Sequence, residues 1–314
     1  GRIMNLEKMV ATRQSYGEAL TKLGEENENV VVLDADLSTA TKTNLFAKKF
    51  PQRFFDIGIA EQDLLGTSAG LASYGKIPFA STFAVFAAGR AYDQIRNSIC
   101  YPKLNVKICA THAGITVGED GATHQMLEDI SLMRSLPNMM VFSPSDDRQT
   151  RWLIEEISKI NNPTYVRLCR LASPEIYEST EKFEIGKGIQ IGEGTDATVI
   201  ATGIVVAEAI KAQEELEKSN IHIRVIDMHT IKPIDKDIII KSAKETKRII
   251  TIEDHSIIGG LGSAVCEVLC EEYPTKVTKM GVKDCFGKSG KATELMKFFE
   301  LTAEDIINEI KRNL

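Results

Sequence analysis

The segment from residue 111 to 125 carries the most chemical information in the sequence. It reads THAGITVGEDGATHQ and contains His112, His124, two acids and three glycines. Such a glycine-rich loop loses much conformational entropy when it becomes ordered, and binding residues are often found on loops of this kind. The spacing of His112, Asp120 and His124 matches no zinc pattern. The loop therefore predicts ligand binding, with no metal ligands.

Two other segments offer a carboxylate and aromatic rings. In DIGIAEQ, residues 56–62, Gly58 permits a sharp turn and Glu61 begins a helix. That carboxylate either complements the helix dipole or points into a crevice, where it shares a proton with a ligand. In STFAVFAAGR, residues 81–90, Phe83 and Phe86 either fill the core or enclose a flat heterocycle. The residues alone leave both pairs of alternatives open.

The elements that must position these residues follow a βαβ rhythm. Short apolar runs alternate with stretches of helical period, which predicts a parallel sheet covered by helices on both faces. The expected strands of the first half are 30–34, 54–57, 106–110, 139–142 and 165–168, and the expected helices are 14–23, 59–73 and 125–136. Ligands bind beyond the carboxyl ends of such strands, where residues 34–36, 58–62, 81–90 and 111–125 all lie.

The rhythm breaks in a polar stretch after Pro174 and then resumes. We expect an α/β fold of two doubly wound domains, residues 4–174 and a smaller domain of residues 195–314, joined by a linker or small hairpin at 175–194. The strands expected in the second domain are 198–201, 224–226 and 248–252, and the helices are 205–216, 236–244 and 262–271.

Composition agrees with an ordinary globular chain. The 314 residues are 43% apolar and 26% charged, with a net charge of −6, which favours neither nucleic acid nor an anionic membrane as a partner. No apolar run approaches a membrane-spanning length and the amino end lacks a signal-peptide pattern, so we expect a cytoplasmic protein. The six cysteines form no C-x-x-C pair and predict no metal site. Residues 1–3, before Met4, look like a tag remnant.

Four segments, in this order along the chain, resemble signatures of the transketolase family. They are IAEQ at 59–62, STFAVF at 81–86, THAGITVGEDGATHQ at 111–125 and EDHSIIGGLGSAV at 253–265. The resemblance covers nearly the whole chain. It implies a pyrimidine-binding domain of the thiamine-diphosphate type, followed by a transketolase C-terminal domain. The implied reaction moves a two-carbon ketol unit from a ketose phosphate to an aldose phosphate.

The resemblance also assigns roles by position in these motifs. Glu61 resembles the glutamate that hydrogen-bonds the aminopyrimidine of thiamine diphosphate, and Phe83 and Phe86 resemble the aromatic residues around that ring. His124 resembles the histidine that polarises the donor carbonyl, and Asp120 the acid that binds a donor hydroxyl. The residues at the channel and its phosphate-binding mouth are then Asp36, His112, Arg170 and Arg13. We expect the local positive charge of this acidic chain at Arg13, Arg170 and the two loop histidines.

Several positions depart from the family pattern. Gly89 stands where many members carry a further aromatic residue. Ala40 falls near a serine that binds phosphate, which Thr39 or Thr41 could replace, and Ala122 replaces a common proline. These differences bear on substrate preference.

The largest departure is that the sequence contains no Gly-Asp-Gly, the family's metal and diphosphate motif. We therefore expect the carboxyl-terminal subunit of a split transketolase. A separate amino-terminal subunit would supply the ligands of Mg²⁺ or Ca²⁺. The expected assembly is an α₂β₂ heterotetramer, although the isolated chain could also self-associate.

Three alternatives remain. A 1-deoxyxylulose-5-phosphate synthase typically carries Asp-Arg-Ala-Gly where this chain has Thr-His-Ala-Gly, residues 111–114. The beta subunit of 2-oxo acid dehydrogenases lacks the GEDGATHQ pattern. A non-catalytic homologue is expected to lack Glu61 or His124, and this chain has both. His222, His229 and His255 are expected to be structural or interfacial.

Overall fold

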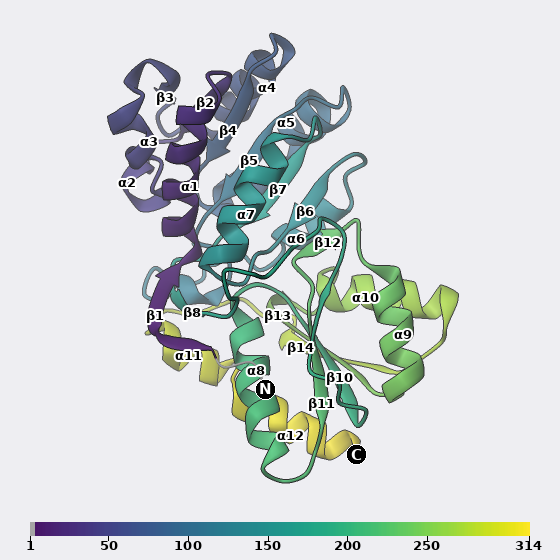
Figure 1. Cartoon of the computed structure of the whole chain (residues 1–314). Coiled ribbons are helices and arrows are strands. Elements are labelled where there is room, and N and C mark those ends of the chain that lie inside the picture. The colour runs from purple at the N-terminus through teal and green to yellow at the C-terminus, as the bar shows by residue number, and fades with distance from the viewer. Residues whose placement is uncertain (1–3) are drawn as a thin grey trace.

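Two α/β domains, each built around its own sheet, lie one above the other in the computed structural model (Figure 1). The structure describes residues 4–314. The expected tag remnant, residues 1–3, lies outside this range. Each sheet has helices on both faces, so the expected class of two doubly wound domains is confirmed.

The first domain contains seven strands in the order β12-β6-β7-β5-β4-β2-β3, and all neighbours are parallel except β12 and β6. Its apolar strands lie in the middle of the domain; every residue of β2 is buried. The bounds are β2 (Val30–Asp34), β3 (Phe54–Asp56), β4 (Ile77–Ser81), β5 (Lys107–Ala110), β6 (Met140–Phe142), β7 (Thr164–Arg167) and β12 (Thr230–Lys232).

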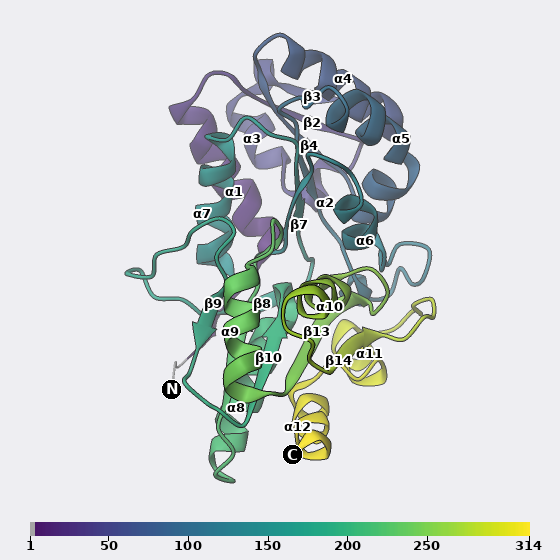
Figure 2. The same cartoon turned by 90° about the vertical axis from the view of Figure 1, so that its right-hand side faces the viewer.

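Helices cover both faces of this sheet (Figure 2). On one face, α1 and α7 pack together and bury Tyr16, Leu20 and Leu153 against the strands. On the other, α4 and α6 bury Leu64 and Ile130. The bounds are α1 (Thr12–Glu26), α2 (Ser38–Thr41), α3 (Asn44–Lys49), α4 (Glu61–Ser73), α5 (Tyr92–Gln94), α6 (Asp129–Arg134) and α7 (Asp147–Ser158). Two π-helical turns, Val85–Arg90 and Ile95–Cys100, flank α5.

The second domain has five strands in the order β14-β13-β10-β11-β9, in which only β9 is antiparallel to its neighbour. Helices α8 and α12 pack together, and so do α9 and α10 (Figure 1). The bounds are β9 (Ile189–Ile191), β10 (Ala197–Ala201), β11 (Ile223–Asp227), β13 (Ile249–Ser256), β14 (Val277–Val282), α8 (Val206–Glu217), α9 (Lys236–Thr246), α10 (Leu261–Glu272), α11 (Ala292–Phe298) and α12 (Ala303–Asn313).

The structure differs from the expected elements in several places. The linker expected at 175–194 contains β9, and β12 from the second half of the chain adds to the edge of the first sheet. Strand β4, which lies between β2 and β5 in the sheet, was not expected. The expected helix 125–136 forms only as α6, because Gln125 belongs to the preceding loop and donates hydrogen bonds to it.

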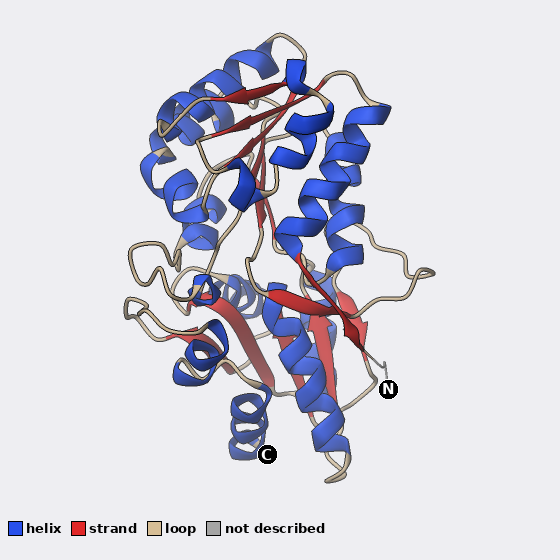
Figure 3. Ribbon diagram, turned by 90° about the vertical axis from the view of Figure 1, so that its left-hand side faces the viewer, coloured by secondary structure: helices blue, strands red, loops and turns tan. Residues whose placement is uncertain are grey.

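An antiparallel ribbon also joins two distant segments at the domain junction. It consists of β1 (Asn5–Ala11) and β8 (Ala172–Glu175) (Figure 3). Over the described range, no helix combines the length and apolar character needed to cross a bilayer.

Candidate active site

The site forms where the parallel strands of the first sheet end. Beyond β3 the chain turns at Gly58, which has a φ of +82°, and α4 begins at Glu61. Beyond β4 lie Phe83 and Phe86, and beyond β5 lies His112. The sheet thus gathers the predicted residues at one edge, as the rule for open parallel sheets requires.

Glu61 is a buried carboxylate at the first position of its helix. Only 5% of the residue is exposed. Within residues 4–314, one charged partner reaches it: Nη1 of Arg90 lies 3.2 Å from Oε1 of Glu61. The arginine side chain is 56% exposed, so the ion pair extends from the buried carboxylate to the surface.

Aromatic rings lie beside this ion pair. The rings of Phe83 and Phe86 are nearly parallel, at 10°, with centroids 5.9 Å apart. Phe83 also stacks on His112 with a centroid distance of 3.8 Å. The edge of His124 faces Phe86 at 5.5 Å. The two phenylalanines and two histidines that the sequence singled out therefore form one continuous cluster.

Arg90 packs against this cluster of rings, a contact that the sequence did not predict. Its guanidinium carbon lies 4.4 Å from the centroid of Phe86, within the range of a cation–π contact. Gly89, where the family often has an aromatic residue, is exposed and would place a Cβ in open space. Both residues belong to the π-helical turn Val85–Arg90. Such turns are frequent at functional sites, but sequence periodicity does not reveal them.

His112 is held in an unusual backbone conformation. Its φ is +58°, a left-handed value that non-glycine residues rarely adopt. It is buried, and its Nδ1 lies 2.8 Å from the hydroxyl of Thr111. Burial, together with the smaller effects of the charges of Arg13, Arg170, His124 and Lys42, lowers the pKa of His112 to about 3. The expectation of a positive charge on His112 is therefore wrong: its imidazole is neutral near pH 7.

The positive charge comes instead from three neighbouring cations, Arg13, Arg170 and Lys42. Arg13 donates from Nη1 to the carbonyl of Ala40 at 2.8 Å, and its pKa is lowered by burial and by Arg170. Arg170 donates from Nη1 to the carbonyl of Val117 at 2.6 Å. Such a concentration of cations favours a bound anion. Lys42 was not predicted. It directly follows α2, in the segment that comes after β2.

Asp34 fixes the chain segment that contains Lys42. Its Oδ2 accepts hydrogen bonds from Thr41 at 2.6 Å and Thr43 at 2.9 Å, on either side of Lys42. Burial raises the pKa of Asp34 to about 6. Because Thr41 is buried in this contact, it is unsuited to bind a substrate phosphate, and the alternative that used Thr41 is wrong. Thr39 is exposed.

Asp36 and Asp120 lie on exposed backbone at the margin of the site. Asp36 has a φ of +60°, and its N–H donates to Oδ1 of Asp56 at 3.0 Å. Asp120 belongs to the same loop as both histidines, four residues before His124. The fold leaves both carboxylates free of ion pairs within residues 4–314.

The three remaining histidines lie away from this site. His255 is buried; its Nε2 accepts from the N–H of Ser131 at 3.4 Å and its Nδ1 lies 2.7 Å from the carbonyl of Ser256. His229 is buried with an edge contact to Trp152, and His222 is exposed.

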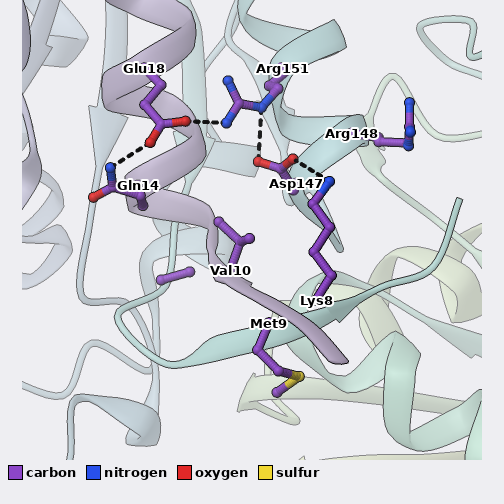
Figure 4. A pocket seen from close by; sticks show the side chains of 9 residues that line it. Lys8, Met9, Val10, Gln14, Glu18, Asp147, Arg148 and Arg151 are labelled. Atoms are coloured by element: carbon purple, nitrogen blue, oxygen red, sulfur yellow. Dashed lines mark hydrogen bonds and ion pairs between the residues drawn. The ribbon is translucent and has the colours of Figure 1, made fainter. Parts of the chain in front are cut away.

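A separate groove of about 620 Å³ lies between β1, α1 and α7 (Figure 4). Its charged side chains neutralise one another: Arg151 pairs with Glu18 and Asp147, and Lys8 lies 3.8 Å from Asp147. It therefore offers little free charge to a ligand. Within residues 4–314, no three His, Cys, Asp or Glu side chains are grouped as a metal site would need.

Sequence models of two known domains match this chain consecutively. The transketolase pyrimidine binding domain matches residues 8–175, and the transketolase C-terminal domain matches residues 186–306. The chain belongs to the transketolase family. The expected resemblance is thereby confirmed for both domains.

Relatives of similar length within the transketolase family are known. A protein of Methanocaldococcus jannaschii described as a transketolase C-terminal section is 52% identical over 305 residues, covering 96% of each chain. A subunit of a 6-deoxy-6-sulfo-D-fructose transketolase from a Clostridium species is 41% identical, covering 94% of this chain and 92% of the relative. A solved split-gene transketolase, described as an inactive β4 tetramer, superimposes with a TM-score of 0.90 at 54% identity, covering 96% of this chain and 98% of the other.

Proposed function

We propose that this chain is the carboxyl-terminal subunit of a thiamine-diphosphate-dependent transketolase that transfers a two-carbon ketol unit between sugar phosphates. One observation carries the proposal. The buried carboxylate of Glu61 pairs with Arg90, whose guanidinium lies over the ring of Phe86, and Phe86 stacks on Phe83. A flat ring with a basic nitrogen needs an acid–base partner of this kind and an aromatic wall.

The residues fit the pyrimidine half of thiamine diphosphate. Glu61 would hold a proton toward a ring nitrogen, and burial shields that hydrogen bond from water. Phe83 and Phe86 would pack on the ring. When bound, the cofactor supplies the carbon nucleophile and electron sink that two-carbon transfer requires. Arg90 must release Glu61 before a ring can reach the carboxylate.

The rest of the site fits a sugar with an anionic end. Because His124 is half-buried and faces Phe86 edge-on, it would hydrogen-bond the donor carbonyl and its neighbouring hydroxyl close to the ring pocket. Neutral His112 would donate a hydrogen bond, while Arg13, Arg170 and Lys42 would hold the phosphate. Asp36 and Asp120 are proposed to bind sugar hydroxyls at the margin.

We infer that a separate amino-terminal subunit completes the enzyme. It would bring the Gly-Asp-Gly motif, the diphosphate site and the ligands for Mg²⁺ or Ca²⁺, for which this chain offers no motif. Two relatives that this chain covers over nearly their whole length support a separate chain of this size. One is described as a C-terminal section and the other as a split-gene transketolase. An α₂β₂ heterotetramer is the proposed active form. The inactive β4 tetramer of the split-gene relative supports self-association without the partner. The proposed location is cytoplasmic, with no nucleic-acid or membrane partner.

A sulfonated sugar is a second candidate substrate. The Clostridium relative is named for 6-deoxy-6-sulfo-D-fructose, and a cluster of cations binds a sulfonate by the same charge-assisted hydrogen bonds as a phosphate.

The test is a reconstitution of the chain with an amino-terminal transketolase subunit that carries the Gly-Asp-Gly motif, in the presence of thiamine diphosphate and Mg²⁺. Three substrate pairs are compared: xylulose 5-phosphate with ribose 5-phosphate, 6-deoxy-6-sulfofructose with glyceraldehyde 3-phosphate, and pyruvate with glyceraldehyde 3-phosphate. The expected result is ketol transfer from xylulose 5-phosphate when both subunits are present and no transfer by this chain alone. Preferred transfer from the sulfonated donor would instead establish the second candidate. Turnover only with pyruvate, or equal turnover by the chain alone, would overturn the proposal.

A further inference from the structure

The loop at 111–125 carries both site histidines, but much of its support comes from the second domain. Within its own domain, the N–H of Ala113 donates to Leu168 and the N–H of Gly114 donates to Met126. Its internal regular structure is the single 3₁₀ turn Ile115–Val117. Arg170 also donates to the carbonyl of Val117, and further contacts that fix the course of the loop come from β13 and from the segment just before α11.

Asp254, on β13, makes one of these contacts. Its Oδ1 accepts a hydrogen bond from the N–H of Ile115 at 3.0 Å. Its Oδ2 lies so near Gly114 that a Cβ on that glycine would come within 1.9 Å of it. Gly114 also has a φ of +78°. The loop backbone is therefore pressed directly against the carboxylate, an approach that only glycine permits.

The backbone that carries this carboxylate is held in place by a buried arginine. Asp254 is buried, and Nη2 of Arg167, at the end of β7, donates to its backbone carbonyl at 2.6 Å. Nε of Arg167 pairs with Asp129 at 3.0 Å, and that pair is also buried. Burial raises the pKa of Asp254, while the charge of Arg167 opposes the shift. Arg167 thus joins the two domains behind the loop.

A second contact fixes the other end of the loop. Nε2 of Gln125 donates to the carbonyl of Lys288 in the second domain at 2.9 Å and to the carbonyl of Gly118 within the loop at 3.2 Å. Ile115 comes three residues after His112, and Gln125 directly follows His124. The second domain therefore anchors the loop beside each histidine.

We propose that Asp254 is a positioning residue through which the second domain sets the places of His112 and His124. This inference builds on the proposed function, because it assigns a role within the same site. Asp254 touches neither histidine ring. It acts by holding the backbone between them, so that the neutral imidazole of His112 stays stacked on Phe83.

The first test is hydrogen exchange measured by mass spectrometry on the whole chain. Wild type is compared with Asp254→Asn, which nearly keeps the side-chain volume and one acceptor oxygen, and with Asp254→Ala. Asp237→Asn, at an exposed site in α9, is the matched control. Exchange of peptides spanning 111–126 should rise about tenfold or more in Asp254→Ala and less in Asp254→Asn, with α8 and α12 unchanged. Unchanged loop exchange, or an equal rise throughout the second domain, would overturn the proposal.

The second test uses the enzyme reconstituted with its amino-terminal subunit. In Asp254→Asn, the KM for the donor sugar phosphate should rise about tenfold, while the Kd of thiamine diphosphate stays within about twofold of wild type. A lower kcat at unchanged KM would indicate lost folded enzyme and would contradict a positioning role. A wild-type mixture with no ketol transfer would refute the proposed function, whereas the exchange experiment would still decide whether Asp254 holds the loop.

Discussion

Arg90 and Glu61 form an ion pair, with 3.2 Å between Nη1 and Oε1. The guanidinium also covers Phe86. A flat group with N–H donors therefore already lies between the carboxylate and the aromatic ring, where the proposed function places the aminopyrimidine. In the proposed function, the guanidinium of Arg90 and the aminopyrimidine would compete for the carboxylate of Glu61 and for the ring face of Phe86.

Removing Arg90 should therefore strengthen cofactor binding. In the reconstituted enzyme, Arg90→Ala is expected to lower the Kd of thiamine diphosphate several-fold, since the pair no longer has to open. Because the Glu61 carboxylate is buried, loss of its charged partner should also lower the free energy of unfolding of the cofactor-free chain. Titration calorimetry measures the Kd, and Arg96→Ala, at an exposed arginine nearby, serves as the control. A weaker cofactor complex would show that Arg90 is a permanent wall of the site.

Loss of a single cation at the mouth should affect substrate binding more than chemistry. Arg170→Ala is expected to raise the KM for the sugar phosphate about 10- to 100-fold with kcat little changed, because a charge-assisted hydrogen bond contributes about 1.5–3 kcal/mol. Steady-state kinetics of the reconstituted enzyme measure both constants. Lys159→Ala, at an exposed lysine in another part of the domain, should change neither. An unaltered KM in Arg170→Ala would place the phosphate elsewhere.

The lowered pKa of His112 predicts how acid destabilises the fold. Its pKa in the folded chain is about 3, whereas the ordinary pKa of a histidine is 6.5, so below pH 6.5 the unfolded chain binds a proton that the native chain excludes. The stability that neutral His112 contributes is complete above pH 6.5 and is lost as the pH falls toward about 3.

His112→Asn lacks that titration. The unfolding free energy of wild type minus that of the variant should thus fall by about 1.4 kcal/mol per pH unit below pH 6.5. Urea unfolding at a series of pH values measures the difference, and His222→Asn, at an exposed histidine, is the control. A difference independent of pH would mean that His112 titrates normally in the native chain.

Local sequence patterns predicted the apolar strands well, because burial on both faces leaves a continuous apolar run. The run at 30–34 is β2 without change. Strand β4 was missed because Pro78 and the small residues Ala80 and Ser81 interrupt its apolar character. The pairing of β12 with β6 depends on contacts between distant segments that no local pattern records.

The site was predicted where chemistry and strand ends coincide. Glu61, Phe83, Phe86, His112 and His124 follow strands and belong to family motifs, and the fold brings the four rings together beside the ion pair of Glu61 and Arg90. Arg90 and Lys42 were missed because their roles depend on a π-helical turn and on a lysine with a φ of +72°. The neutral state of His112 follows from burial beside cations, which sequence alone does not reveal.

The most direct test of the account is the ketol-transfer rate of Glu61→Gln in the enzyme reconstituted with its amino-terminal subunit. Glutamine keeps the shape of the side chain but removes the carboxylate needed for proton sharing, so kcat should fall at least about 100-fold. Circular dichroism should show an unchanged fold, because the one ion-pair partner of Glu61 within residues 4–314 is Arg90, whose side chain is exposed. A variant that folds normally and retains the wild-type turnover would contradict the central role assigned to Glu61.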